Sequence, residues 1–233
     1  MRIVNPDSDH HMHTLNFSDG LSTVEELVRH AGSLGLKRIA ITDHSDDNRR
    51  AWSRTGVSGR PVVKRWRNVH NDVDVVFGVE ADVLNRKGDI CDTIEGVRGG
   101  FLVLSAHRES YQDGHETITE AYLNALERFH DRIDVLGHLD AVYFKDHVDV
   151  RKVVEAANEY GIPLELNGSG LLKGSSVPEH TRMILKRADR VMVNSDAHCL
   201  SDLYDARRKA FDFIRDNGFL DRVENRHEIE ILK

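Results

Sequence analysis

Two short runs of histidine and aspartate lie near opposite ends of the chain and could together bind a metal ion. The first is Asp9-His10-His11-Met12-His13, and the second is Asp196-Ala197-His198. In an extended strand alternate side chains share a face, so His11 and His13 point the same way and His10 points away. Two imidazoles on one face are suited to clamp a divalent ion. An isolated pair would fit a histidine-rich surface tract equally well. The predicted elements around the pair are therefore needed to distinguish a metal site from such a tract.

The rest of the chain alternates between short apolar runs and amphipathic stretches. Ser22 and Glu25 are spaced as a capping box, and apolar residues at helical spacing then predict a helix that ends at Gly35. Apolar runs bounded by turn residues predict strands at 9–13, 38–43, 73–79, 101–106, 134–137, 163–166 and 191–194. Helical patterns between them include 118–129, 153–160 and 183–188. The pattern predicts one α/β domain over residues 1–233, with about seven parallel strands.

Nearly every predicted strand ends at or near a polar residue that can bind a metal ion or carry a proton. These residues are His44, Glu80, His107, His138, Asn167, Asp196 and His198. In a closed or nearly closed parallel barrel the C-terminal strand ends lie on one face, where such folds keep their active sites. Core packing explains any single histidine more simply, but chance explains the whole alignment poorly. The pattern therefore predicts a site on that face.

One segment, residues 45–69, departs from the alternation. It contains both tryptophans and seven basic residues: Trp52, Trp66, Arg49, Arg50, Arg54, Arg60, Lys64, Arg65 and Arg67. One interpretation is a lid over the rim, in which Arg49 and Arg50 contact phosphate oxygens and an indole stacks on a ring or base. The other is a solvated loop and helix whose tryptophans cover the side of the barrel, with Trp66 favoured as the core residue.

Composition excludes several classes of protein. The 233 residues include only two cysteines, Cys91 and Cys199, which argues against a disulfide framework and predicts a reducing cytoplasm. No apolar run approaches the roughly 18 residues of a membrane span, and the first residues lack the apolar core of a signal peptide. A net charge of −7 argues against a general nucleic-acid coat protein. Oligomeric state is not predicted.

Taken together, the motifs resemble those of the PHP family, named after polymerase and histidinol phosphatase. The resemblance runs in the family's order from Asp9 to His198. It rests on Asp9-x-His11-x-His13-Thr14, Thr42-Asp43-His44, Glu80 after Phe77-Gly78-Val79, Ser105-Ala106-His107, Gly137-His138-Leu139-Asp140 and Ser195-Asp196-Ala197-His198. A set of ordered motifs is far more specific than a lone H-x-H.

The resemblance implies a distorted (β/α)7 barrel, similar to a TIM barrel, with a trinuclear metal site at the C-terminal strand ends and phosphoester hydrolysis as its activity. The nine implied ligands are six histidines and three carboxylates: His11, His13, His44, His107, His138, His198, Asp19, Glu80 and Asp196. The resemblance implies that His11, His13 and Asp196 hold the first ion, and that His107 and His138 hold the second. Glu80 would bridge these two ions. The third ion would be held by Asp19, His44 and His198. Family members vary between His and Asp at Asp19, which makes the third site the least secure.

The chemistry of these side chains favours a similar site. Imidazole and carboxylate ligands suit two to three zinc, manganese or iron ions. Two such ions can share a hydroxide that attacks phosphorus, and the resemblance implies that Glu80 bridges them. Asp43 could protonate the leaving oxygen, or orient a ligand histidine, which is the favoured alternative. Arg108 could bind phosphate or pair with Glu109.

Three functions fit this site. The favoured one is a phosphatase for a small phosphomonoester, such as histidinol phosphate, with Asn167 as a further substrate-binding residue. The second is a nuclease or nucleotide phosphoesterase, supported by the basic segment with Trp52. The third is a non-catalytic interaction module, which would be expected to have lost some of the ligands. The metal ligands are shared among such proteins, so they predict the chemistry and leave the substrate open.

Overall fold

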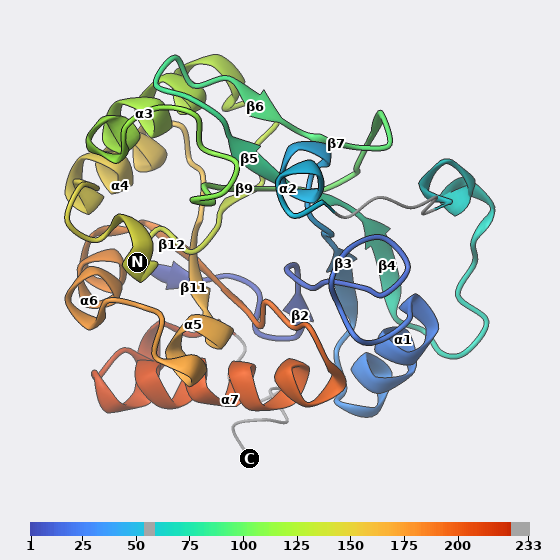
Figure 1. Cartoon of the computed structure of the whole chain (residues 1–233). Coiled ribbons are helices and arrows are strands. Elements are labelled where there is room, and N and C mark those ends of the chain that lie inside the picture. Colours follow the sequence, from blue (N-terminus) through green and yellow to red (C-terminus); the bar gives the residue numbers. More distant parts are fainter. Residues whose placement is uncertain (54–58, 225–233) are drawn as a thin grey trace.

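The computed structural model describes residues 1–53 and 59–224, and its centre is a mainly parallel sheet covered by helices (Figure 1). Seven strands are hydrogen bonded in the order β1-β12-β11-β10-β9-β5-β6, and only β6 is antiparallel to its neighbour. Their bounds are β1 Arg2–Ile3, β12 Arg190–Asn194, β11 Leu164–Asn167, β10 Val135–Leu136, β9 Leu102–Ser105, β5 Val79–Val83 and β6 Ile90–Cys91. The predicted α/β class with parallel strands is confirmed.

A second parallel sheet lies beside the first, in the order β2-β3-β4. Its strands are β2 Ser8–Asp9, β3 Arg38–Ile41 and β4 Asp74–Phe77, and a separate hairpin joins β7 Thr93–Ile94 to β8 Val97–Arg98. Isolated parallel bridges connect the two larger sheets, between Met12 and Ala197 and between His44 and Glu80. These ladders and bridges stop short of a continuous barrel, so the closed barrel and the single domain stay predictions.

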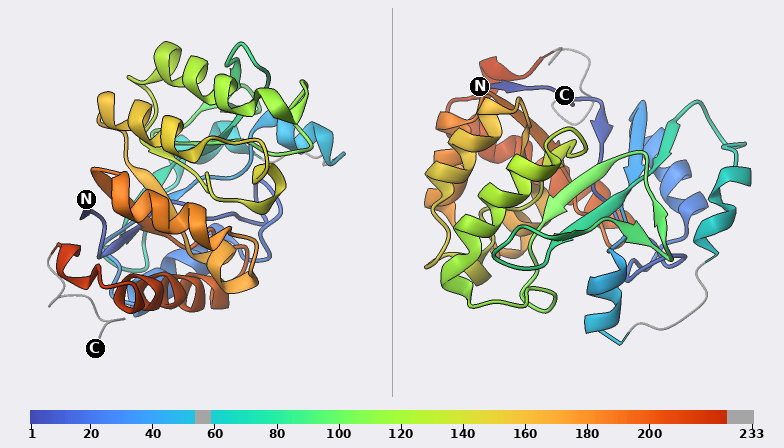
Figure 2. Two further views of the ribbon diagram at one scale, coloured as in Figure 1. Left: turned by 90° about the vertical axis from the view of Figure 1, so that its left-hand side faces the viewer. Right: turned by 90° about the horizontal axis from the view of Figure 1, so that it is seen from above.

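Helices cover the outer face of the larger sheet. In Figure 2 the helices α3, α4, α6 and α7 follow one another along that face, and contacts join α3 to α4 and α4 to α6. The helix bounds are α1 Val24–Ser33, α2 Asp46–Ala51, α3 Ile118–Phe129, α4 Val150–Glu159, α5 Gly168–Lys173, α6 Pro178–Arg187 and α7 Leu200–Asp216. The 3-10 turns are η1 Arg60–Arg65, η2 His115–Thr117, η3 Val142–Phe144 and η4 Leu220–Arg222. Buried residues at helical spacing, such as Ile118, Ala121 and Ala125, form the inner faces.

The start of α1 differs by one residue from the prediction. The capping box is formed by Thr23 and Glu26, not by Ser22 and Glu25. Both pairs have the required spacing, but the backbone oxygen of Ser22 accepts a hydrogen bond from Leu15 at 2.8 Å. This contact keeps Ser22 in the preceding loop and leaves Thr23 to cap the helix.

The predicted strand at 73–79 is wrong in its end, because the chain changes sheets at Gly78. A Cβ atom at Gly78 would lie 2.6 Å from the carbonyl oxygen of Phe101, so only glycine fits this crossing. Glu80 consequently lies inside β5 and pairs with Val103 of β9, rather than following a strand. The crossing turns the Glu80 side chain toward both sheets.

A buried ion pair joins α7 to the junction of the two sheets. Arg207 is 2% exposed and lies 3.2 Å from a carboxylate oxygen of Asp9. It also donates to the backbone oxygens of Ser8 and Val193, at 2.7 and 2.8 Å. Since breaking such a pair would leave a buried charge, this contact holds β2 against β12. Among the helices of the described ranges, none is long and apolar enough for a membrane span.

Candidate metal centre

The nine residues implied as metal ligands come together at one rim of the structure. Donor atoms of eight of them form three overlapping groups, in each of which all atoms lie within 4.8 Å of one another: His11/His13/Asp196, His13/Asp19/His44/His198 and His44/Glu80/His107. The ninth residue, His138, lies with its Nε2 atom 2.9 Å from Glu80. The first and third predicted sites reappear in these groups. His44 lies with Glu80 and His107, where the resemblance implied His138. How the ligands divide between ions stays a prediction.

Glu80 lies at the centre of the cluster. Its Oε1 atom lies 2.9 Å from Nε2 of His138, and its Oε2 atom lies 2.8 Å from Nδ1 of His44. Three further imidazoles lie within 4 Å of its carboxylate, those of His11 at 3.3 Å, His107 at 3.4 Å and His13 at 3.7 Å. The side chain is 1% exposed. A buried carboxylate among five imidazoles, which follow the ends of four strands, is well suited to bridge metal ions.

Several donor atoms of this cluster have no hydrogen-bond partner among the described residues. They are Nε2 of His11, Nε2 of His13, Nδ1 of His44 and Oε2 of Glu80; the last two lie 2.8 Å apart, but not at the angles of a hydrogen bond. Buried polar atoms are normally hydrogen bonded, because an unpaired one costs about 1–3 kcal/mol. Lone pairs that converge without protein partners are what a bound cation requires, so these residues fit divalent metal ions.

The electrostatics of the cluster favour ionised carboxylates and a neutral His13, whereas neighbouring carboxylates outweigh burial and raise the pKa values of His11 and His107. Burial alone would raise the pKa of Glu80, but the surrounding imidazoles, foremost His107, hold that pKa well below its usual value. Burial also opposes charge on Asp196, and imidazoles led by His11 lower its pKa. Burial and neighbouring imidazoles lower the pKa of His13 to about 3. Ionised carboxylates and a neutral imidazole are the forms that bind metals.

Asp19 and Asp196 connect the cluster to the loops above the strands. Oδ1 of Asp19 lies 3.5 Å from Nε2 of both His44 and His198. Burial lowers the pKa of His198, but the hydrogen bond to Asp19 and the charge of Asp196 outweigh it and raise that pKa to about 9. Asp196 has a left-handed backbone, with φ of 52°, and its Oδ1 atom lies 3.2 Å from Nε2 of His13. Strained backbone of this kind is concentrated at functional sites.

Two buried carboxylates that the sequence analysis missed orient the histidines from behind. Glu165 lies 2.8 Å from Nδ1 of His11 and also accepts the backbone N–H of His138 at 2.8 Å. Asp82 lies 2.7 Å from Nδ1 of His107 and accepts from the Ser110 hydroxyl at 2.5 Å. A carboxylate that contacts one nitrogen of an imidazole ring fixes the tautomer and directs the other ring nitrogen toward the metal. Side chains alternate between the two faces along β5 and β11, and this alternation is the sequence signal that could have identified Asp82 and Glu165.

Asp43 is buried beneath the cluster. Its Oδ1 atom accepts from the backbone of Thr14 and the hydroxyl of Ser18, both at 2.6 Å. The Ser18 hydroxyl in turn lies 3.4 Å from Nδ1 of His13. Burial raises the pKa of Asp43. These contacts favour the orienting alternative over direct protonation of a leaving group.

A cavity of about 460 Å³ opens over the cluster and shows where the predicted substrate residues lie. It is lined by the candidate ligands Asp19, His44, Glu80, His107, His138, Asp196 and His198 and by Asn48, Trp52, Arg108, Glu109 and Tyr143. Arg108 therefore lies where it was predicted. Arg49, Arg50 and Asn167 do not line this cavity.

These three residues are held elsewhere by their own contacts. Arg49 lies 3.5 Å from Asp46, and Arg50 lies 2.5 Å from Asp47, on the same short helix. Asn167 is buried and donates to Glu165 at 3.0 Å and to Asp196 at 3.1 Å. The structure thus gives Asn167 a part in positioning Asp196, and it pairs both arginines with carboxylates of their own helix. Arg54 lies outside the described residues.

His10 is buried and lies outside the cluster. It points away from the cluster as predicted, but it is 5% exposed and stacks on Phe101 with ring centres 4.8 Å apart. Burial, with the charges of Arg38 and Arg207, lowers the pKa of His10 to about 4. It is a neutral core residue.

Comparison with known proteins places the chain in a family. The PHP domain model matches residues 9–169, which is well over half of the chain, so this protein belongs to the PHP domain family. A protein of Caldanaerobacter subterraneus, named a probable phosphatase, is 29% identical over 210 residues that cover 84% of this chain and 77% of that protein. A probable phosphatase of Aliivibrio fischeri is 30% identical over 175 residues, covering 72% and 68%.

A solved structure has a similar fold. Histidinol phosphate phosphatase of Lactococcus lactis, determined with zinc, L-histidinol and phosphate, aligns with a TM-score of 0.56 over 92% of this chain and 94% of that one. The two sequences are 14% identical, so the likeness supports the fold.

Proposed function

We propose that this PHP-family hydrolase is a metal-dependent phosphatase that removes phosphate from a small phosphomonoester. The observation that carries the proposal is the convergence of six histidines and two further carboxylates around Glu80, beneath the cavity of about 460 Å³. The relatives named as probable phosphatases support this reaction class. Histidinol phosphate is the first substrate to test, because the L. lactis structure holds histidinol and phosphate.

The proposed metal ligands are the nine residues of the cluster, with zinc, manganese or iron as the candidate ions. When bound, such ions act as Lewis acids and lower the pKa of water toward neutrality. The protein contributes the geometry. Glu80 holds the imidazoles around one carboxylate, while Glu165 and Asp82 fix the ring orientation of His11 and His107.

Arg108 and the shape of the cavity define what the substrate can be. Arg108 lines the cavity beside His107 and supplies a guanidinium that can bind phosphate oxygens. The volume of about 460 Å³ lies within the range of small-molecule pockets, about 300–1,000 Å³. A small ester fits this space better than a long nucleic-acid strand.

The test is phosphate release by the purified protein with manganese, zinc or iron. The panel should contain histidinol phosphate, sugar phosphates, nucleoside monophosphates, an aryl phosphate and a single-stranded oligonucleotide. We expect turnover of at least one small monoester and none of the internal bonds of the oligonucleotide. Cleavage of the oligonucleotide without release from any monoester would instead favour a nuclease.

A further inference from the structure

Arg60 is a buried positive charge at the start of the turn η1. It is 0% exposed, although both interpretations of the segment 45–69 placed its basic residues at a rim or in solvent. A guanidinium is not buried without compensating contacts, because the loss of its hydration is costly. The contacts of Arg60 therefore show which parts of the protein it holds together.

Three of these contacts join the loop 14–20 to the point where the chain changes sheets. Nη2 of Arg60 donates to the backbone oxygen of Gly78. The guanidinium carbon lies 5.3 Å from the ring centre of Phe17 and 5.6 Å from that of Phe77, and cations at such distances are attracted to aromatic rings. The two rings pack edge to face, with centres 6.2 Å apart. Arg60 thus fastens the loop to the end of β4.

The same loop is held from a second side by the buried Asp43, whose charge interacts with that of Arg60. Burial raises the pKa of Asp43 and lowers that of Arg60, and the attraction between the two charges opposes both shifts. One oxygen of Asp43 accepts from the backbone of Thr14 and the hydroxyl of Ser18, both at 2.6 Å, and the other accepts from the Thr14 hydroxyl at 2.9 Å. The guanidinium compensates the buried carboxylate that receives these hydrogen bonds.

Asp19 lies in this loop, two residues beyond Phe17 and one beyond Ser18. Its Oδ1 atom lies 3.5 Å from Nε2 of both His44 and His198, so it is the carboxylate of the third predicted metal site. A ligand on a loop is placed precisely only if the loop itself is anchored. The anchors at Phe17 and Ser18 therefore determine where the Asp19 carboxylate lies.

The crossing at Gly78 has backbone support that does not depend on Arg60. The N–H of Gly78 donates to the oxygen of Ile41 at 2.8 Å, and the N–H of Val79 donates to the oxygen of Phe101 at 2.9 Å. These bonds hold the start of β5, the strand that carries the bridging carboxylate. Loss of the guanidinium should therefore disturb the loop more than it disturbs the bridge.

We propose that Arg60 is a positioning residue for the third metal site, and that it acts through the loop 14–20 to hold Asp19 toward His44 and His198. The inference rests on the proposed metal centre and deepens it, because it makes the affinity for one ion depend on the segment 45–69. In this role a basic residue of the segment supports the site from within the fold.

Counting bound ions tests the role of Arg60 without requiring turnover. The chelated protein is titrated with manganese, and bound ions are counted from the loss of the electron paramagnetic resonance signal of the free ion. We expect three ions in the wild type. Asp19→Asn should weaken the binding of one of them by about ten- to a hundredfold, and Arg60→Met should weaken the same ion by about tenfold. The other two affinities should change by less than about threefold in both variants.

Two comparisons separate positioning from general stability. If Arg60 acts through Asp19, the double variant Arg60→Met/Asp19→Asn should bind the third ion no more weakly than Asp19→Asn alone, because substitutions in one coupled unit are not additive. Arg60→Lys keeps the charge and should recover most of the affinity. Val63→Ala is the matched control, since it removes apolar packing from the same turn and should leave all three affinities unchanged.

Phe17→Leu replaces Arg60→Met if that variant folds poorly, because it removes the aromatic ring from the other side of the contact and should cause the same selective loss. Four results would overturn the inference: a wild type that binds only two ions, unchanged third-ion affinity in Arg60→Met, equal losses for all three ions, and the same selective loss in Val63→Ala. The phosphatase proposal fails differently, since no ester would then be hydrolysed whatever the number of bound ions.

Discussion

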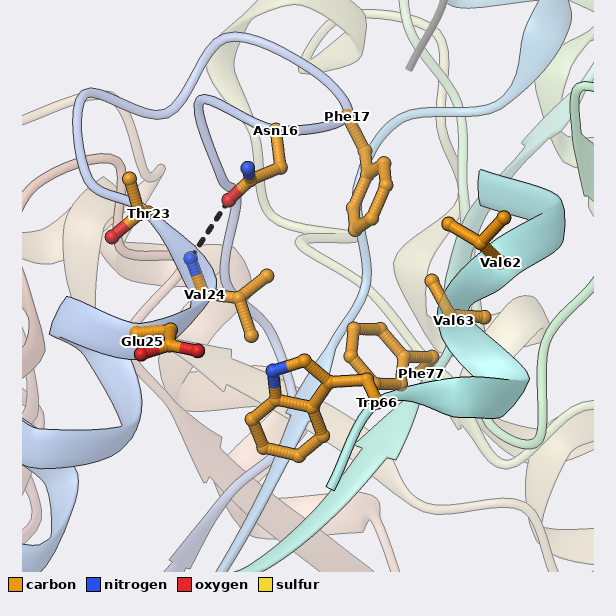
Figure 3. Close-up of a pocket in the computed structure, with 9 residues that line it drawn as sticks. All are labelled: Asn16, Phe17, Thr23, Val24, Glu25, Val62, Val63, Trp66 and Phe77. Carbon is orange, nitrogen blue, oxygen red and sulfur yellow. Dashed lines mark hydrogen bonds between the residues drawn. The ribbon is translucent and has the colours of Figure 1, made fainter. Parts of the chain in front are cut away.

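Two cavities of similar size each have residues of the segment 45–69 in their lining, and they differ in their chemistry. The cavity over the metal centre has a volume of about 460 Å³ and contains Trp52 in its wall. The second, of about 420 Å³, lies between α1 and η1 and contains Trp66 (Figure 3). One segment of chain therefore contributes one tryptophan to each.

The second cavity is lined mainly by apolar side chains. Figure 3 shows Trp66 beside Phe77, with Val24, Val63 and Phe17 around them, and the rings of Trp66 and Phe77 are 5.5 Å apart. Its lining contains a single acidic residue, whose carboxylate lies 2.6 Å from His70. One buried polar atom of the lining, Nε1 of Trp66, lacks a partner among the described residues. The metal-centre cavity concentrates unpaired donors and acceptors, so chemistry and not volume distinguishes the two.

Removal of metal ions should produce the largest difference between the cavities. Dialysis against a chelator should abolish phosphate release, because the clustered carboxylates and imidazoles then lack the Lewis acid they are arranged to hold. The melting temperature should fall, since ions that bind only the folded state stabilise it. Activity and scanning calorimetry measure both effects. Full activity in the chelated protein, with metal content below one ion per chain, would contradict the metal centre.

Glu80→Gln should reduce kcat by a factor on the order of 10³ or more. The substitution removes the charge at the centre of five imidazoles and keeps the size of the side chain. Glu25→Gln makes the same change in the wall of the apolar cavity and should alter kcat by less than twofold. Steady-state kinetics and metal analysis follow both variants. Similar losses in the two would show that the difference between the cavities is not functional.

Glu165→Gln should have a smaller effect, a loss of about ten- to a hundredfold in metal affinity or activity. The glutamine keeps the size of the side chain but no longer stabilises the ring of His11 with a charge 2.8 Å away. Metal titration followed by activity checks it. Asp82→Asn, which acts on His107 in the same manner, should behave alike. If both variants retained wild-type affinity, the buried carboxylates would have no role in orienting the ligands.

Trp66→Ala should affect stability and leave activity within about twofold. The indole packs on Phe77 and is partly buried, so we expect a loss of about 2 kcal/mol, below the value for a fully buried aromatic side chain. Trp52→Ala, at a side chain that is 52% exposed, should cost less stability. Chemical denaturation measures both. A large fall in kcat with Trp66→Ala would show that the apolar cavity is coupled to the reaction.

Local patterns determined the strands that carry the site and the helices that cover them. A strand has a period of two and a helix a period of 3.6, so apolar residues marked β3, β9, β11 and β12 to within a few residues. His44, His107 and His138 follow such strands closely, and for this reason their placement at one rim could be predicted. The sequence also carried the ordered motifs that resemble the PHP family, which the match over residues 9–169 confirmed.

Contacts between distant segments decided the remainder. Glu165 and His11 are 154 residues apart, and nothing in either strand's own pattern states that they meet at 2.8 Å. The same holds for the crossing at Gly78, where the carbonyl oxygen of Phe101 leaves no space for a side chain and so turns Glu80 into the cluster. Sequence alone determined which residues could bind metal ions, because that depends on side-chain chemistry and local period. The tertiary structure decided which buried groups orient them and which side-chain atoms, such as those of the Asn48 amide, have no partner among the described residues, because a hydrogen bond depends on every segment that packs nearby.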